Sequence, residues 1–250
     1  MNLSEDAVRN HEELWPDYIS KAKLTDPELI EIFDNFAFDE VLQYGRLETK
    51  TRIMMILAST IASQALTEYK MFVNAALNTG ITPIEIKEIV YQSVPYVGIS
   101  KVIDFIYVTN EIFTDKGVKL PLEGQSTTSA EARFEKGLVV QKSIFGDVID
   151  AMYETSPEDE LHIQKYLSAN CFGDYYTRKG LDIKTRELLT YSMLISMGGT
   201  EPQVKGHIQG NINVGNSREI LLSVTTQLLP YIGYPRTLNA IKCINETITQ

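Results

Sequence analysis

Apolar residues recur at the spacing of an α-helix through most of the chain. In the stretch QVKGHIQGNINVG (203–215), Val204, Ile208 and Ile212 fall four residues apart, so they form one apolar stripe along a helix. Gly215 then provides a natural helix end. The sequence contains no hairpin signal and no strict apolar–polar alternation of useful length. The pattern predicts an all-α protein.

The helical pattern is present twice, and the two copies share short motifs in the same order. One copy starts at Leu47 and the other at Leu181. The shared positions are K-T-R at 50–52 and 184–186, a glycine at 80 and 215, and P-Y-x-G at 95–98 and 230–233. Such self-similarity indicates a duplicated unit, and each copy is predicted to form four helices separated by turns.

Helix starts are readable at matching places in the two copies. Thr82 is predicted to cap a helix that has Pro83 at its first position and Glu85 as the acid of a capping box. The residues from Thr200 to Gln203 predict the same arrangement in the second copy.

A linker separates the two copies. The segment DKGVKLPLEGQSTTSA (115–130) is rich in Gly, Pro, Ser and Thr and lacks helical periodicity. We therefore expect an N-terminal domain over 1–115, a linker over 116–130 and a C-terminal domain over 131–250.

Composition narrows the class of protein. Apolar residues make up 44% of the chain and charged residues 22%, which is typical of a soluble globular protein. No run of 18 apolar residues and no signal peptide is readable, so we expect a cytoplasmic protein without a membrane partner. The net charge of −10 repels phosphate backbones, which argues against a nucleic-acid partner.

The metal-binding and redox-active residue types are sparse. Cys171 and Cys243 form no C-x-x-C motif, so we expect them to be reduced structural thiols. His11 and His162 stand among charged residues, without cysteine or aspartate neighbours at metal-ligand spacing. The sequence predicts no metal site.

A polar row runs beside the apolar stripe of 203–215. Gln203, His207 and Asn211 lie one turn apart on the same helix. A histidine at the edge of a core is partly desolvated and flanked by hydrogen-bonding groups, which makes proton transfer possible. The alternative is a core histidine with a purely structural role.

The two copies differ at the positions that could carry chemistry. Glu187 and His207 of the second copy correspond to Ile53 and Phe72 of the first. An apolar pair is what a core prefers when no chemistry is required. The second copy is therefore the candidate catalytic unit, although Glu187 could instead be a solvated residue in the first turns of a helix.

Two further residues are candidates for substrate contact. Arg186, like Arg52 in the first copy, lies early in its helix, where a cation opposes the helix dipole and needs a carboxylate partner. That carboxylate could belong to the protein or to a substrate. Tyr191 could line a cavity for a ring-shaped substrate, or it could belong to the core.

Several stretches resemble the carboxymuconolactone decarboxylase family. They are FGDYYTRKGLDIKTRELLT (172–190), GGTEPQVKGHIQGNINVG (198–215) and LLPYIGYPRTLNA (228–240), preceded by a leader-like FEKGLVVQKSIFGD (134–147). The first copy resembles the family more weakly, over 38–113. The resemblance covers most of the chain.

The resemblance implies an all-helical fold whose single domains assemble into rings, with active sites at helix and subunit boundaries. Some members decarboxylate a lactone acid. Others, similar to alkylhydroperoxidase D, reduce peroxiredoxin partners with a glutamate, a C-x-x-C pair and a histidine. This chain has Thr200 and Gln203 at the cysteine positions, and neither can exchange a disulfide.

The resulting hypothesis is a cofactor-free enzyme that acts by acid–base chemistry on a small organic acid or lactone. Glu187 and His207 are the predicted catalytic residues, and the predicted substrate contacts are Arg186, Gln203, Tyr191 and Asn211. We expect a homo-oligomer, with a trimer of the two-copy chain forming a six-domain ring. The alternatives are an alkylhydroperoxidase-like antioxidant protein with peroxiredoxin-type activity and a non-catalytic assembly module with a vestigial site.

Overall fold

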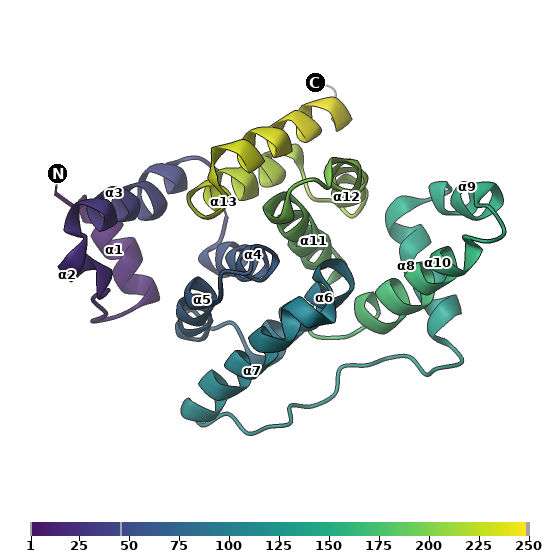
Figure 1. Cartoon of the computed structure of the whole chain (residues 1–250), viewed down its shortest axis with the longest axis horizontal. Coiled ribbons are helices and arrows are strands. Elements are labelled where there is room, and N and C mark those ends of the chain that lie inside the picture. Colours follow the sequence, from purple (N-terminus) through teal and green to yellow (C-terminus); the bar gives the residue numbers. More distant parts are fainter. Residues whose placement is uncertain (1, 46, 249–250) are drawn as a thin grey trace.

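The computed structural model describes residues 2–45 and 47–248, and it is built from helices (Figure 1). No strand occurs within these two ranges, which confirms the all-α prediction. In the same residues, no helix combines the length and apolar character needed to cross a membrane.

The first half contains four leader elements and then four longer helices. The elements are α1 (Glu5–Leu14), α2 (Ala22–Thr25), α3 (Pro27–Phe38), the 3-10 helix η1 (Glu40–Gln43), α4 (Thr49–Ala62), α5 (Leu66–Asn78), α6 (Pro83–Val97) and α7 (Ile99–Asp115).

The second half repeats this order after a helix-free segment. Its elements are α8 (Arg133–Phe145), α9 (Val148–Thr155), α10 (Leu161–Tyr166), the π-helical η2 (Leu167–Tyr176), α11 (Ile183–Met197), α12 (Glu201–Asn213) and α13 (Arg218–Thr247). Gly233 breaks α13 with a φ of 78°, so its two parts correspond to α6 and α7. The duplication predicted from the motifs is therefore present in the helix order.

The predicted helix signals are confirmed in the first copy and only partly in the second. Thr82 and Glu85 form a capping box at the start of α6. Gly80 and Gly215 both have a positive φ just after a helix, and each ends it in the same way. The capping box predicted at Thr200 is wrong, because the Thr200 hydroxyl donates to the Leu194 carbonyl oxygen (2.8 Å) instead of capping α12.

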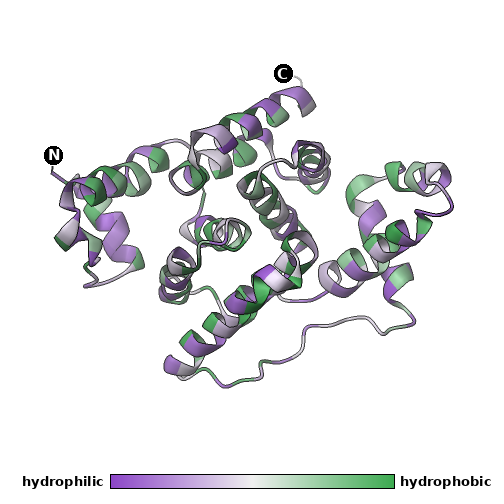
Figure 2. Ribbon diagram, viewed as in Figure 1, coloured by the Kyte–Doolittle hydropathy of each residue, from purple (hydrophilic) through white to green (hydrophobic). Residues whose placement is uncertain are grey.

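One hydrophobic core is shared by the two copies. Its centre is the contact between α4 and α11, where the Ser196 hydroxyl donates to Ser59 Oγ at 2.8 Å. Figure 2 shows hydrophobic residues along α4, α6 and α11 in the middle of the molecule. The leader helices α1–α3 and α8–α10 lie at opposite ends, on either side of this centre (Figure 1).

The third helix of each copy contacts both copies across this core. It packs on the first helix of the other copy, so α6 covers α11 and α13 covers α4, and it packs on the first helix of its own copy as well. The two leaders also pack in matching ways. Each leader covers the second helix of its own copy, with α1 on α5 and α8 on α12. Each leader also contacts the third helix of the other copy, with α3 on α13 and η2 on α6. Each half therefore has a region enclosed by its own leader, its own second helix and the other copy's P-Y-x-G helix.

Two core tyrosines predict how the fold responds to alkaline pH. Tyr69 and Tyr191 are fully buried, each bonded to a threonine hydroxyl, and burial raises the pKa of both phenols above the ordinary value near 10. The unfolded chain therefore releases these protons first, so stability is retained below about pH 10 and falls above it. We expect the free energy of unfolding to fall by about 1.4 kcal/mol per pH unit for each tyrosine.

Urea denaturation between about pH 9 and 11 measures this dependence. Tyr191→Phe should make the decline shallower, whereas Tyr234→Phe, at a side chain that is 62% exposed, should leave it unchanged. The same slope in wild type and both variants would contradict the assignment.

Candidate active site

Glu187 and His207 meet at the contact between α11 and α12. The Asp182 side chain caps α11 by accepting from the Thr185 N–H at 2.8 Å, and Glu187 follows within the next turn. The Glu187 side chain has no exposed surface, and its Oε2 lies 2.9 Å from His207 Nδ1. The His207 side chain is 13% exposed. The structure thus brings together the two residues that the sequence singled out as catalytic.

This pairing fixes the two nitrogens of the imidazole in different roles. A carboxylate beside Nδ1 favours a proton on that nitrogen, which leaves Nε2 as the nitrogen that can exchange a proton with another molecule. Within the described residues, no hydrogen bond engages His207 Nε2. The arrangement suits a general acid or base.

Two tyrosines extend the cluster on the other side of Glu187. The Tyr176 hydroxyl from η2 donates to Glu187 Oε1 at 2.9 Å, and the Tyr96 hydroxyl from α6 donates to Tyr176 at 3.0 Å. Burial raises the pKa of both phenols well above the ordinary value, so both stay protonated at neutral pH. The Tyr96 ring also packs edge-on against His207, with centroids 5.9 Å apart. The first copy therefore supplies one wall of the second copy's site.

Thr190 and Gln92 support the tyrosines. The Tyr176 and Thr190 hydroxyls are 2.6 Å apart, and the Gln92 amide donates to Thr190 at 3.1 Å. Since Gln92 is on α6, this is a second connection from the first copy to the cluster.

Asn211 fixes the angle between α11 and α12. Its side-chain amide donates to the backbone carbonyl oxygens of Glu187 (3.0 Å) and His207 (2.7 Å), and its oxygen accepts from Asn216 at 2.8 Å. The side chain is fully buried. Asn211 therefore positions Glu187 and His207 relative to each other.

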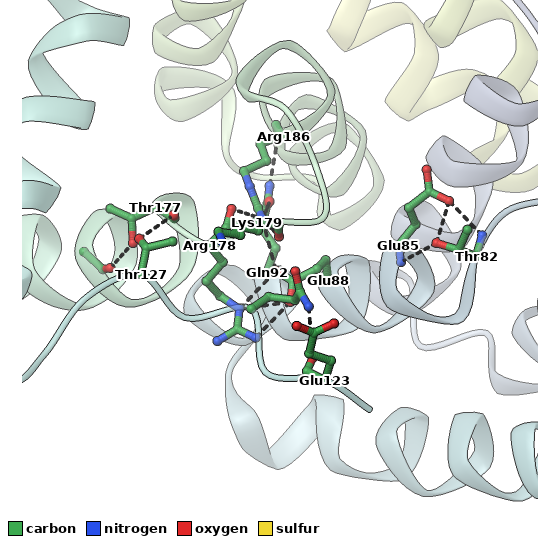
Figure 3. Close-up of polar contacts among 12 residues, drawn as sticks. Thr82, Glu85, Glu88, Gln92, Glu123, Thr127, Thr177, Arg178, Lys179 and Arg186 are labelled. Carbon is green, nitrogen blue, oxygen red and sulfur yellow. Dashed lines mark hydrogen bonds and ion pairs between the residues drawn. The ribbon is translucent and has the colours of Figure 1, made fainter. Parts of the chain in front are cut away.

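Arg186 is held by the protein itself, as Figure 3 shows. Its guanidinium donates to Glu88 Oε2 (3.0 Å), to Gln92 Oε1 (2.9 Å) and to the backbone oxygens of Arg178 and Lys179. Arg178 also binds Glu88, through two of its nitrogens. With Arg186 only 1% exposed, the carboxylate that this cation needs is Glu88 of the first copy rather than a group at the surface.

Tyr191 and Gln203 also lie apart from the Glu187 carboxylate. The Tyr191 hydroxyl pairs with Thr225 of α13 at 2.6 Å, and its ring is part of the shared core. Gln203 is exposed one turn before His207, and its side chain makes no hydrogen bond among the described residues. Of the four predicted substrate contacts, Gln203 is the one that faces solvent.

Gly210 makes room for the pair. A Cβ at this position would lie 2.7 Å from Glu187 Oε2 and 2.9 Å from Phe145 Cε1. The Phe145 ring contacts the His207 ring edge-on, with centroids 5.3 Å apart. Glycine is therefore required here for α12 to approach the carboxylate.

The cysteines do not form a dithiol. Both are free and buried, and they belong to different parts of the core, Cys243 to the shared cluster and Cys171 to a small cluster with Tyr176. Burial raises the pKa of the Cys171 thiol to about 12. A thiol with this pKa is a poor nucleophile at neutral pH.

Solvent comes close to the cluster beside Tyr176. An open hollow of about 570 Å³ is lined by Tyr176, by Val139 and Val140 of α8, and by Ile183 at the start of α11. Lys136 also lines this hollow.

Comparisons with known proteins agree on one family. The model of the carboxymuconolactone decarboxylase family matches residues 27–111 and 162–246. The 4-carboxymuconolactone decarboxylase of Acinetobacter baylyi is 25% identical over 117 residues, which are 46% of this chain and 87% of that protein. A Burkholderia xenovorans structure, provisionally described as a gamma-carboxymuconolactone decarboxylase subunit, is 20% identical, with a TM-score of 0.56 and 95% of each chain covered. That structural likeness concerns the fold.

Sequence reasoning missed Tyr96 and Tyr176. Tyr96 belongs to the P-Y-x-G motif, which served only as evidence of the duplication, although a tyrosine retained in both copies was a usable signal. Tyr176 stands in the FGDYY stretch close to Glu187, but the π-helical turn that aims it at the carboxylate leaves no simple pattern.

Substitution by alanine should affect stability differently at two glycines of α12. Nothing lies within 4 Å of a Cβ at Gly206, so Gly206→Ala should raise the free energy of unfolding by about 1 kcal/mol through helix propensity. Gly210→Ala should not be stabilised in this way, because the added Cβ would collide with the Glu187 carboxylate and displace it. Chemical denaturation measures both variants, and equal stabilisation by the two substitutions would contradict the close approach.

Proposed function

The chain belongs to the carboxymuconolactone decarboxylase family, and we infer from this that it is a decarboxylase acting on a small lactone acid. We assign Glu187 and His207 as its acid–base pair. The observation that carries the assignment is the 2.9 Å contact of His207 Nδ1 with a carboxylate that has no exposed surface. A small lactone acid is also the class of substrate named for the Acinetobacter baylyi relative.

The reaction requires one proton and a place for one electron pair. When the bond to the carboxylate breaks, carbon dioxide leaves, and the electron pair remains on the carbon and spreads to the lactone carbonyl. His207 Nε2–H then donates its proton to that carbon, so the carboxylate is replaced by hydrogen. Glu187 stabilises the imidazolium before the transfer, and the Tyr176 hydroxyl stabilises Glu187. No cofactor takes part in this scheme.

The difference between the copies supports a single site per chain. The first copy has Ile53 and Phe72 at the positions of Glu187 and His207, and both are in the core. It contributes Tyr96 to the second copy's cluster instead. The first copy is then a structural partner that completes the site.

The open hollow beside Tyr176 suits the proposed substrate class. Val139, Val140 and Ile183 provide apolar surface for a ring. Lys136 provides a cation for a carboxylate, although Glu135 lines the same hollow and the Lys136 ammonium donates to the Thr127 carbonyl oxygen at 2.6 Å. A reductase is not supported by this geometry, because Cys171 and Cys243 are buried in separate clusters. An assembly module without chemistry would have no use for a buried, hydrogen-bonded carboxylate at this place.

We expect His207→Phe to remove most of the activity while preserving the fold. Phe72 occupies the corresponding position of the first copy, so the architecture accepts this ring. Turnover of 4-carboxymuconolactone, followed by carbon dioxide release, should fall by about 10² to 10⁴-fold, the usual contribution of one acid–base group. The melting temperature should fall, because Glu187 Oε2 loses its imidazole partner, whereas Phe72 of the first copy stands opposite the apolar Ile53.

The matched control is His162→Phe, at an exposed histidine of α10. It should leave turnover unchanged. Unaltered turnover in His207→Phe would eliminate the assigned pair, and a wild-type protein that releases no carbon dioxide from lactone acids would eliminate the decarboxylase.

The proposed assembly is a trimer that forms a six-domain ring. Exposed apolar side chains of the second leader provide a surface for it, among them Val148 (69% exposed) and Ile163 (55% exposed). Light scattering should give about three times the chain mass of 28.2 kDa. Val148→Glu with Ile163→Glu should lower this mass, and Leu24→Glu, at a residue of the first leader that is 80% exposed, should not. A monomer at micromolar concentration would refute the assembly.

A further inference from the structure

The first copy contains a cavity at the place that corresponds to the candidate active site. The cavity measures about 280 Å³ and is enclosed by the leader helices α1–α3 and by α5. Phe72, the counterpart of His207, lines it and packs edge-on against Tyr231, with ring centroids 5.4 Å apart. Tyr231 is in turn the counterpart of Tyr96. The first copy therefore keeps a cavity at this place, although it lacks counterparts of Glu187 and His207.

A buried acidic side chain faces the cavity. Asp34 of α3 lines it and is only 8% exposed. No hydrogen bond or ion pair reaches Asp34 from any other residue that the structure describes. A buried carboxylate without a partner costs several kcal/mol unless a cation or a donor compensates it. Burial raises the pKa of the Asp34 carboxyl, and His11 and Lys23 oppose this rise, so a cation bound in the cavity would favour the charged form of Asp34.

Aromatic rings form the walls around Asp34. The Trp15 ring is close to perpendicular to those of Phe38 and Phe72, with centroids 5.8 and 5.1 Å away, and Phe33 packs edge-on against Phe38. All four rings line the cavity. A cation is attracted to the face of an aromatic ring. The His11 ring packs against Trp15 and Phe38 in the same wall, with centroids 5.1 and 5.4 Å away.

The remaining charged groups leave the cavity negative. Glu12 and Glu68 line it together with Asp34, and Lys23 is the one lysine among the lining residues. His11 also lines it, and burial lowers the pKa of its imidazole, so that His11 is neutral at neutral pH. The electrostatic field therefore attracts cations and repels organic acids.

We propose that this cavity is a binding site for a small alkylammonium cation, held between Asp34 and the aromatic walls. The volume suits a ligand of about the size of choline. The site is separate from the Glu187–His207 pair, and the inference does not depend on the proposed decarboxylase activity.

The tryptophan in the wall makes binding directly measurable. Trp15 is the single tryptophan of the chain, so its fluorescence reports on this cavity alone. Titration of the full-length protein with choline should give a saturable change. The uncharged isostere 3,3-dimethylbutan-1-ol should bind at least about tenfold more weakly, and benzoate should not bind.

Variants distinguish this site from nonspecific effects. Asp34→Asn should weaken choline binding about tenfold or more, whereas Asp104→Asn, at an exposed residue of α7, should leave it unchanged. Lys23→Met should tighten it by removing the competing ammonium, and the exposed Glu68→Gln should weaken it even if Asp34→Asn fails to fold. His207→Phe should have no effect on choline binding.

Three results would overturn the proposal. They are no saturable signal with choline, equal affinity for choline and its uncharged isostere, or a preference for benzoate. Unchanged choline binding in a folded Asp34→Asn would do the same.

Discussion

The buried carboxylate of Glu187 is the constraint around which the second copy is built. An ionised group with no exposed surface is tolerated only when its oxygens are hydrogen-bonded, and here one oxygen accepts from Tyr176 and the other faces His207. These partners come from the leader and from α12. The Tyr176 hydroxyl is in turn bonded to Tyr96 of the first copy. The leader must therefore pack on α11 and α12 before the carboxylate is satisfied, and the first copy contributes by holding Tyr176.

A second buried network ties the copies together next to this site. Glu88 of α6 is 1% exposed and receives the guanidinium groups of Arg178 and Arg186, so the loss of its carboxylate would leave two cations without a counter-charge. The first copy lacks this network, because Ser223 stands at the position that corresponds to Glu88. Its arginine, Arg52, is 7% exposed and forms no ion pair with the described residues. Both the candidate chemistry and its electrostatic support are thus concentrated on one side of a duplicated fold.

The parts of the structure that depend on local sequence could be predicted. Helix class, duplication, the glycine ends at Gly80 and Gly215 and the Thr82 cap follow from periodicity and backbone preferences, and all are present. The cap predicted at Thr200 failed because Gly198 and Gly199, both with positive φ, bend the chain so that the threonine bonds backwards. A local motif is informative only when the preceding backbone has the expected direction.

Partners from the other copy could not be predicted in this way. Comparison of the copies was enough to single out Glu187 and His207. Three residues reach the site because α6 of the first copy packs on α11 of the second; they are Glu88, Gln92 and Tyr96. The spacing of residues along the sequence does not indicate that contact between the copies. For the same reason, the sequence alone left open whether the carboxylate partner of Arg186 belongs to the protein or to a substrate.

A double-mutant cycle tests most directly whether Glu187 and His207 act as one catalytic unit. The measurement is kcat/KM for Glu187→Gln, His207→Phe and the double variant, on a lactone acid that the wild type decarboxylates. If Glu187 works through the imidazole, the double variant should be no slower than His207→Phe alone. Losses that multiply in the double variant would show that the two residues act independently and would contradict the account.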